Sequence, residues 1–212
     1  MRLFLGTYLN AECRKRLCEF QNRNSQDNKA LETIKVRWIH GDKLHMTWNF
    51  LGQVKESSIP SLLKAIERAV ESYGKELSDG APPPLVSFEQ PSLWPRPSSP
   101  RLLVVQPQRI GDSFNLLARL LRENTDAFVE KDKGEHYDVF KPHITLARLG
   151  AWREDSSKHK LSLGDFAGWA ELLPMLLNIE TVDLISSSSN MGDSANAYQT
   201  VQEFSVNKFH KP

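Results

Sequence analysis

Few cysteines, no long apolar run and almost no net charge characterise this chain of 212 residues, and each shortage excludes a class of protein. The two cysteines, Cys13 and Cys18, make neither a disulfide framework nor a CxxC motif, which favours packing thiols in a reducing compartment. No apolar stretch reaches the ~18 residues of a membrane span, and the apolar start is too short for a signal peptide. We therefore expect a cytoplasmic protein with no membrane contact.

An excess of charge of one sign is missing as well. The 27 Lys and Arg residues are balanced by 26 Asp and Glu residues, which gives a formal net charge of +1. So weak a field does not gather a long nucleic acid as the field of a strongly basic protein does. A polyanion must therefore be held by a few local side chains. We expect a monomer that needs no protein partner.

One short pattern occurs twice, once in each half of the chain: a histidine, any residue, a threonine and a large apolar residue. The copies are His45-Met46-Thr47-Trp48 and His143-Ile144-Thr145-Leu146. In both copies polar and apolar residues alternate, which is the period of a half-buried strand, so each histidine shares a face with its threonine. The apolar face packs on a helix layer, and the polar face looks into a cleft or solvent. The repetition predicts two imidazoles that are neighbours across one cleft.

The same alternation assigns the residues that follow the first copy. Asn49 is expected on the polar face with His45 and Thr47, and Phe50 on the apolar face with Met46 and Trp48. This assignment assumes a strand without irregularities.

Hydrophobic periodicity predicts the elements of the first half of the chain. In order, these are a strand over 1–8, a helix from its cap at Asn10 to Phe20, a polar break over 21–29, a strand over 35–39, a hairpin through Gly41 and Asp42 that places this strand beside His45, and a helix from Pro60 to Gly74. Seven of the 12 prolines then lie between Pro82 and Pro100, around a short strand over 85–88. They predict an irregular crossover between two halves.

The second half repeats this order, which we interpret as an internal duplication. Its predicted elements are a strand over 101–105, a helix that begins near Asp112 or Ser113, a charged loop over 130–138, the His143 strand, a short helix over 172–177 interrupted by Pro174, and a strand pair over 179–185 and 198–206 joined by a loop within 186–193. The chain is thus expected to form one domain of two lobes, approximately 1–90 and 101–206, with the crossover near 82–100.

Two histidines beside one phosphate suit an in-line displacement at phosphorus. With an unperturbed pKa of about 6.5, one imidazole activates the attacking oxygen while the other, protonated, protonates the leaving oxygen. The two threonine hydroxyls donate to the nonbridging oxygens. Such a reaction requires no metal and no cofactor. A zinc site is the alternative, but it needs three or four convergent ligands, and the remaining histidines show no ligand spacing with either motif: His40, His136, His159 and His210.

The segments around the two motifs resemble the 2H phosphoesterases, and more narrowly the RNA 2′,3′-cyclic phosphodiesterases first described as 2′-5′ RNA ligases. The matching segments are Phe4 in the opening strand, Val36-Arg37-Trp38, residues 44–52 and residues 140–148. The similarity extends from Arg2 to about Val206, and the second motif is the more specific one.

The resemblance implies an α+β fold of two pseudo-twofold related lobes, each an antiparallel sheet with helices on its outer face, and an active cleft between the lobes. It further implies hydrolysis of 2′,3′-cyclic phosphate RNA ends to 2′-phosphates without a cofactor. By position, His45 is then the acid for the 3′ oxygen and His143 the base for water, while Thr47 and Thr145 bind the phosphate.

Two further site residues follow from the resemblance. Arg148 would contact the phosphate, although strict alternation from His143 sends it to the opposite face unless the strand bulges. Phe4 could stack on an unpaired base at the cleft edge, or belong to the core. Arg37 lies either near the mouth of the cleft or on a solvated strand face.

Three functions remain open at this point. The first is the hydrolysis of cyclic phosphate ends of RNA. The second keeps the same residues but acts on 2′-5′ linked oligonucleotides or on a small cyclic nucleotide. The third is a nucleotide-binding module without turnover, against which the presence of both histidines and both threonines argues.

Overall fold

A computed structural model of the chain describes residues 1–25, 28–32, 34–77, 84–130, 140–152, 161–187 and 198–206. Within these ranges the strands are β1 Arg2–Tyr8, β2 Ile34–Trp38, β3 His45–Gln53, β4 Leu85–Trp94, β5 Leu102–Pro107, β6 Ile144–Trp152, β7 Met175–Asn178, β8 Thr181–Ser187 and β9 Tyr198–Ser205. The α-helices of the same ranges are α1 Ala11–Ser25, α2 Ile59–Glu76, α3 Asp112–Thr125 and α4 Trp169–Leu172. The predicted α+β class is confirmed.

The nine strands form one antiparallel sheet in the order β7-β4-β5-β6-β3-β1-β8-β9, with β2 paired to β6. This order is symmetric about the junction of β6 and β3, the strands that carry the two motifs. Each side of the junction takes strands from both ends of the chain, because β8 and β9 lie beside β1 while β2 lies beside β6. The division of the sequence into lobes at 1–90 and 101–206 stays a prediction.

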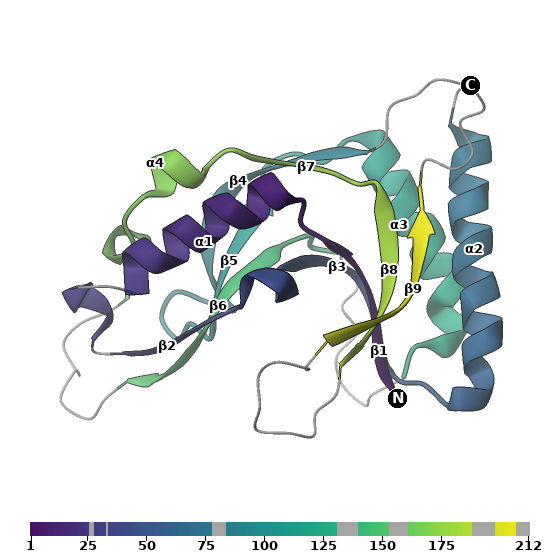
Figure 1. The fold of residues 1–212 in the computed structure, drawn as a ribbon, viewed down its shortest axis with the longest axis horizontal. Coiled ribbons are helices and arrows are strands. Elements are labelled where there is room, and N and C mark those ends of the chain that lie inside the picture. The colour runs from purple at the N-terminus through teal and green to yellow at the C-terminus, as the bar shows by residue number, and fades with distance from the viewer. Residues whose placement is uncertain are drawn as a thin grey trace.

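The helices form two pairs that lie beside different strands of the sheet (Figure 1). Helices α2 and α3 pack on each other beside β3 and β9, whereas α1 and α4 lie over the side that contains β7. Helix α1 begins where Asn10 predicts, since the Asn10 Oδ1 accepts a hydrogen bond from the Cys13 backbone N–H at 2.8 Å. Cys13, Leu17 and Phe20 are all buried, as the periodicity predicts.

The polar break predicted at Gln21 is wrong, because α1 continues to Ser25. Gln21 and Asn24 are buried on the same stripe as the apolar residues, and their amides replace apolar contacts with hydrogen bonds to the backbone. Asn24 donates to the Ala167 carbonyl and accepts from the Ala167 N–H, both at 2.9 Å. Hydrophobic periodicity counts a polar residue as exposed even when it is buried and hydrogen-bonded to a distant part of the chain. The predicted helix therefore ends too early.

The strand over 35–39 does not form the predicted hairpin with the His45 strand. β2 pairs instead with β6, where Arg37 lies opposite Arg148 and Trp38 opposite Ala147. The segment Gly41–Lys43 forms a 3₁₀ turn that leads the chain away from β2 and into β3. As a result β2 extends the sheet beside the second motif rather than the first.

Two further segments differ from the prediction. Residues 85–94 form one long strand, β4, rather than an irregular crossover, and Pro91 is tolerated because β7 pairs only with Leu85–Phe88 and leaves one flank of β4 without a neighbour there. Past Pro174 the chain enters strand β7, so the predicted helix over 172–177 is limited to α4 before it. Most of the predicted charged loop over 130–138, namely residues 131–138, lies outside the described residues.

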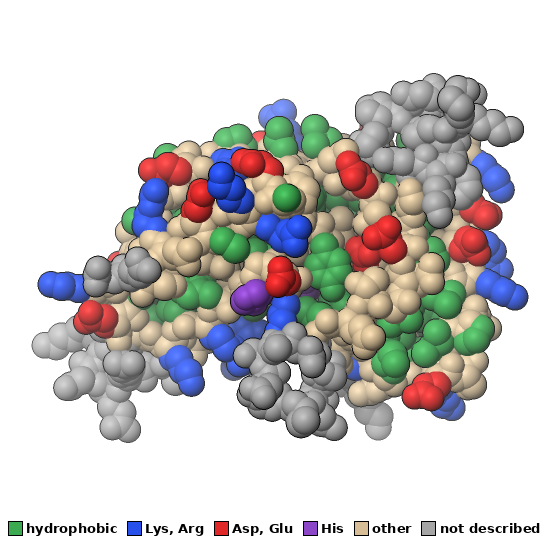
Figure 2. Space-filling view, viewed as in Figure 1, with side chains coloured by type: hydrophobic (Ala, Val, Ile, Leu, Met, Phe, Trp, Pro, Cys, Tyr) green, Lys and Arg blue, Asp and Glu red, His purple; other side chains and the backbone are tan. Residues whose placement is uncertain are grey.

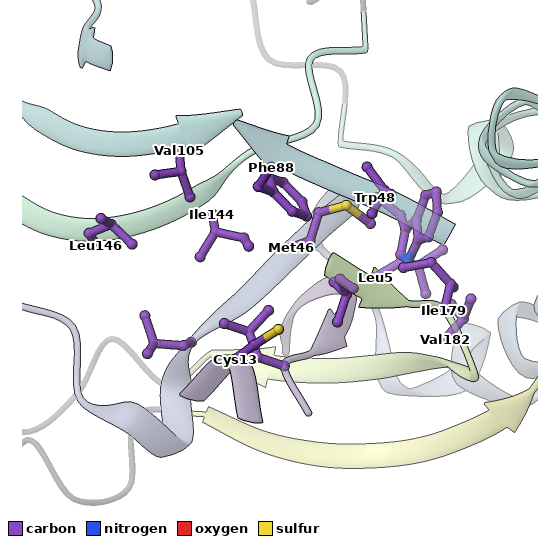
Figure 3. Packing of buried hydrophobic residues seen from close by; sticks show 14 of the residues in the cluster. Leu5, Cys13, Met46, Trp48, Phe88, Val105, Ile144, Leu146, Ile179 and Val182 are labelled. Carbon is purple, nitrogen blue, oxygen red and sulfur yellow. The ribbon is translucent and has the colours of Figure 1, made fainter. Parts of the chain in front are cut away.

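The core lies between the sheet and the helices. Met46 and Ile144, which follow the two motif histidines, pack there beside Phe88 (Figure 3). Trp48 packs on Phe114 of α3 with a ring separation of 4.7 Å, and its indole N–H donates to the Thr7 hydroxyl at 2.8 Å. The apolar residues of both motifs are thus fully used in packing, which fixes the opposite faces of β3 and β6.

Candidate active site

The two motif histidines meet where the two sides of the sheet join. β3 and β6 pair there through Met46 and Ile144, each of which follows its histidine by one residue. His45 and His143 therefore hold equivalent positions about the junction. Met46 and Ile144 point into the core, so the two histidines project from the opposite, open face of the sheet.

Both imidazoles are oriented by the same contact. Nδ1 of His45 lies 2.6 Å from the carbonyl oxygen of Lys43, and Nδ1 of His143 lies 2.8 Å from the carbonyl oxygen of Lys141. Because a carbonyl oxygen only accepts, each Nδ1 carries a proton and donates it. Nε2 of each ring is then the atom left for chemistry.

Partial burial lowers the pKa of both histidines from the ordinary value of 6.5. For His45 desolvation is the largest cause, and the positive charges of His143 and Arg148 lower its pKa further, against the hydrogen bond to Lys43, which raises it. For His143 desolvation again outweighs the bond to Lys141. Both rings are mainly neutral near pH 7 in the unliganded protein, and His45 lies close enough to His143 and Arg148 for a positive charge on either to lower its pKa.

Thr47 and Thr145 lie on the open face with their histidines, as predicted, and both side chains are half-buried. Thr47 is opposite Gly6 of β1, where a Cβ atom would lie 3.1 Å from the Met46 carbonyl oxygen and 3.3 Å from the Phe4 ring. A side chain at residue 6 would crowd both neighbours, so glycine suits this position and leaves the surface beside Thr47 open.

A β-bulge turns Arg148 to the face that carries His143. The pairing of β6 with β5 skips a residue, because Leu103 pairs with Ala147 whereas Val104 pairs with Thr145. Leu146 and Ala147 are both buried, and from Arg148 onward exposed and buried residues alternate in the opposite phase. Arg148 is exposed on the side of the histidines, consistent with the effect of its charge on the pKa of His45.

A matching irregularity in β3 corrects the faces assigned to Asn49 and Phe50. The register of β3 against β1 shifts on both sides of these residues. Asn49 donates to the hydroxyl of the buried Thr125 in α3, at 3.1 Å, so it turns toward the helix layer. Phe50 is 60% exposed and its ring lies 5.9 Å from that of Phe4, on the face of His45. Phe50 and Arg148 each follow their motif histidine by five residues.

Aromatic rings support both histidines. Phe4 lies 4.9 Å from the His45 ring and Tyr198 lies 5.3 Å from it, and these two aromatic rings are themselves 5.4 Å apart. Trp94, at the end of β4, lies 4.4 Å from the His143 ring. Phe4 is only 3% exposed, which leaves little surface for a base to stack on. Alternation within single strands did not find Phe50, Trp94 or Tyr198, since each reaches the site through a bulge or from another strand.

Over the described ranges, no group of three or more His, Cys, Asp or Glu side chains could hold a metal ion. None of the helices that the structure describes is long and apolar enough to cross a membrane.

Comparison with known proteins identifies the fold. No protein-family model matches the chain, and no curated protein matches it. Solved structures do: the protein TT0787 of Thermus thermophilus is 22% identical, with a TM-score of 0.68 over 97% of this chain and 98% of its own. A structure described as a phosphoesterase is 19% identical, with a TM-score of 0.64 over 96% and 97%. E. coli LigT complexed with 3′-AMP is 20% identical, with a TM-score of 0.61 over 96% of both chains. The chain therefore has the phosphoesterase and LigT fold that the two motifs predict.

Proposed function

We propose that the protein is a 2H phosphoesterase that hydrolyses 2′,3′-cyclic phosphate ends of RNA to 2′-phosphates by metal-independent acid–base catalysis. The observation that carries this proposal is the matched pair His45 and His143, each held through Nδ1 by the carbonyl two positions before it. The fold adds support, since it is shared with a structure described as a phosphoesterase and with LigT, which has been crystallised with 3′-AMP.

The proposed reaction is one in-line displacement at phosphorus. Nε2 of His143 accepts a proton from water, and the water oxygen forms a bond to phosphorus. The bond from phosphorus to the 3′ oxygen breaks, and Nε2 of His45 gives its proton to that oxygen. The product is a 2′-phosphate with a free 3′ hydroxyl. Each imidazole ends the reaction in the protonation state of the other, so a proton exchange with solvent restores the enzyme.

The groups around the two histidines are suited to these acid and base roles. A substrate phosphate offsets the effect of burial on the imidazoles, because its negative charge stabilises an imidazolium. Thr47 and Thr145 donate hydroxyl hydrogen bonds to the nonbridging oxygens, and Arg148 adds a positive charge where negative charge builds. The Phe4 ring packs against the His45 ring, and the exposed Phe50 ring provides a surface on which an unpaired base can stack.

Two other substrates use the same groups, namely a 2′-5′ linked dinucleotide and a free 2′,3′-cyclic nucleotide. Hydrolysis rates should therefore be compared for a short RNA with a 2′,3′-cyclic end, for 2′,3′-cyclic AMP and for a 2′-5′ linked dinucleotide, all with EDTA present. The proposal predicts the highest kcat/KM for the cyclic RNA end and a 2′-phosphate product. A 3′-phosphate product would reverse the assignment of the leaving oxygen. If the protein bound all three compounds without turnover, it would be a nucleotide-binding module and not an enzyme.

A further inference from the structure

Arg37 lies directly beside Arg148 on the open face of the sheet. The two residues are paired in the antiparallel register of β2 and β6. Residues opposite each other in such a pair point to the same face, with their Cβ atoms about 4.5–5.5 Å apart. Both arginines are exposed, whereas Trp38, the next residue of β2, contacts Phe20 of α1 on the other face. Arg37 therefore projects on the same side of the sheet as His143.

Two like charges opposite each other in a sheet are unfavourable unless an anion lies between them. The ion pairs within the described ranges use Arg14, Arg23 and Arg119, and Arg37 and Arg148 are not among them. On the face that Figure 2 shows, basic and acidic side chains are interspersed, whereas Arg37 and Arg148 are two basic residues directly opposite each other. Such a pair of guanidinium groups is suited to bind phosphate.

The arginine pair lies farther along β6 than the two histidines. Aromatic rings flank both imidazoles, namely Phe4, Tyr8 and Tyr198 at His45 and Trp94 at His143. The positive charge of Arg148 lowers the pKa of His45, and Arg37 lies opposite Arg148 on β2. A nucleic acid chain that leaves the site along β6 therefore gains favourable contacts for its phosphates at the two arginines.

We propose that Arg37 binds the phosphate of the nucleotide that precedes the reacting one, so that the site selects the end of an RNA chain over a free cyclic nucleotide. This inference rests on the proposed function and names its substrate class. Arg148 is the arginine that the proposed function places at the reacting phosphate, and Arg37 lies opposite it on β2, about 4.8 Å across the sheet. Arg37 thus reaches a second phosphate without contacting the first.

The test compares 2′,3′-cyclic AMP with the dinucleotide ApA that ends in a 2′,3′-cyclic phosphate. The dinucleotide contains the additional phosphate and the mononucleotide does not. Arg37→Gln should lower kcat/KM for the dinucleotide about 10-fold and leave that for 2′,3′-cyclic AMP within about 2-fold of wild type, since only one phosphate contact is lost. Arg68→Gln on α2 makes the same charge change away from the site, and it should alter neither rate.

Equal losses on both substrates, or a wild-type enzyme that does not prefer the dinucleotide, would overturn the assignment of Arg37. A binding experiment separates this result from failure of the proposed function. Binding of adenosine 2′-monophosphate and of ApA with a terminal 2′-phosphate needs no turnover. If wild-type protein binds the dinucleotide more tightly than the mononucleotide and Arg37→Gln abolishes this difference, the phosphate site is supported even if hydrolysis is absent. For Arg37→Gln, the slope of the logarithm of the binding constant of the dinucleotide against the logarithm of the salt concentration should also be smaller in magnitude by about 0.7.

Discussion

Each candidate catalytic histidine is prepared for proton transfer by two local features. The carbonyl two positions earlier in the chain holds Nδ1, and partial burial lowers the pKa of the ring below 6.5. An imidazole with a lowered pKa is a stronger acid when protonated, and its neutral form is available at lower pH. The pH dependence of the reaction follows from this environment.

We predict that kcat/KM follows a bell-shaped pH profile whose alkaline limb lies below the ordinary imidazole pKa of 6.5. This limb reports loss of the proton from the acid in the free enzyme, where burial disfavours the imidazolium. In the complex the substrate phosphate favours the imidazolium, so the alkaline limb of kcat should lie at higher pH. Initial rates at limiting and saturating substrate test both limbs, which belong to the coupled pair. An alkaline limb of kcat/KM above that of kcat would contradict this electrostatic account.

The separate roles of His45 and His143 can be tested with the leaving group. A p-nitrophenyl phosphodiester releases a stable anion that needs little protonation, so it should partly rescue His45→Ala but not His143→Ala. The measurement is the rate of each variant relative to wild type on this ester and on the cyclic RNA end. If the ester rescued both variants equally, or neither, the assignment of acid and base would lose its support.

At the scale of the element, the bulge in β6 is the feature that assembles the site. The Leu146 carbonyl at the bulge accepts hydrogen bonds from the Ile39 N–H at 2.9 Å and from the Gln21 amide at 3.3 Å. Gln21 also donates to the Ile39 carbonyl at 2.9 Å. A helix side chain that is 7% exposed thus supports the strand segment that turns Arg148 toward the histidines.

This element also shows how far the sequence predicts the site. Strand alternation correctly places His45, Thr47, His143 and Thr145, because the apolar residues between them form the core. Alternation fails from Asn49 and Ala147 onward, where contacts with other elements shift the phase of the strand. Those contacts join residues far apart in the chain, and local periodicity carries no information about them. The same limitation explains why periodicity predicts an end of α1 before Gln21, although the helix continues to Ser25.

We predict that Gln21→Met destabilises the protein by about 1–3 kcal/mol, because the Ile39 carbonyl loses the amide donor and the Leu146 carbonyl loses one of its two donors while side-chain volume is kept. The variant should also raise KM for the cyclic RNA end, since Arg148 follows the bulge. Urea unfolding and steady-state kinetics measure the two effects. Asn22→Met changes the exposed neighbour on α1 and should stay within about 0.5 kcal/mol of wild type. Equal stabilities of the two variants would show that Gln21 does not support the bulge.

At the scale of the whole molecule, the sheet that joins the two sides of the site also contains a buried carboxyl. Asp183 on β8 is 3% exposed and lies opposite Glu203 of β9. Desolvation and the charge of Glu203 raise the pKa of Asp183 to about 6, against hydrogen bonds from Tyr8 and Thr181 that lower it. A raised pKa means that the folded state holds this proton more tightly than the unfolded state. Its contribution to stability is complete below pH 3.8 and is lost as the pH rises through about 6.

We predict that Asp183→Asn becomes increasingly more stable than wild type as the pH rises from about 4 to 6, by on the order of 2–3 kcal/mol at pH 7. The reason is that the wild-type carboxyl must ionise in a buried position and asparagine does not. Unfolding free energies from urea titrations at several pH values measure this difference. Glu203→Gln removes the repelling charge and should produce a smaller change of the same sign. A difference between Asp183→Asn and wild type that did not vary with pH would contradict the assignment.

The central claim, a metal-independent reaction at two histidines, is tested most directly by turnover of an RNA with a 2′,3′-cyclic end in excess EDTA. Wild-type protein, His45→Ala and His143→Ala should be compared, with thermal unfolding to confirm that each variant is folded. We predict that EDTA leaves the wild-type rate unchanged and that each variant loses about 10²–10⁴-fold in rate, the usual contribution of general acid–base catalysis. A folded variant with a near wild-type rate, or a wild-type activity that EDTA abolishes and a divalent ion restores, would contradict the account.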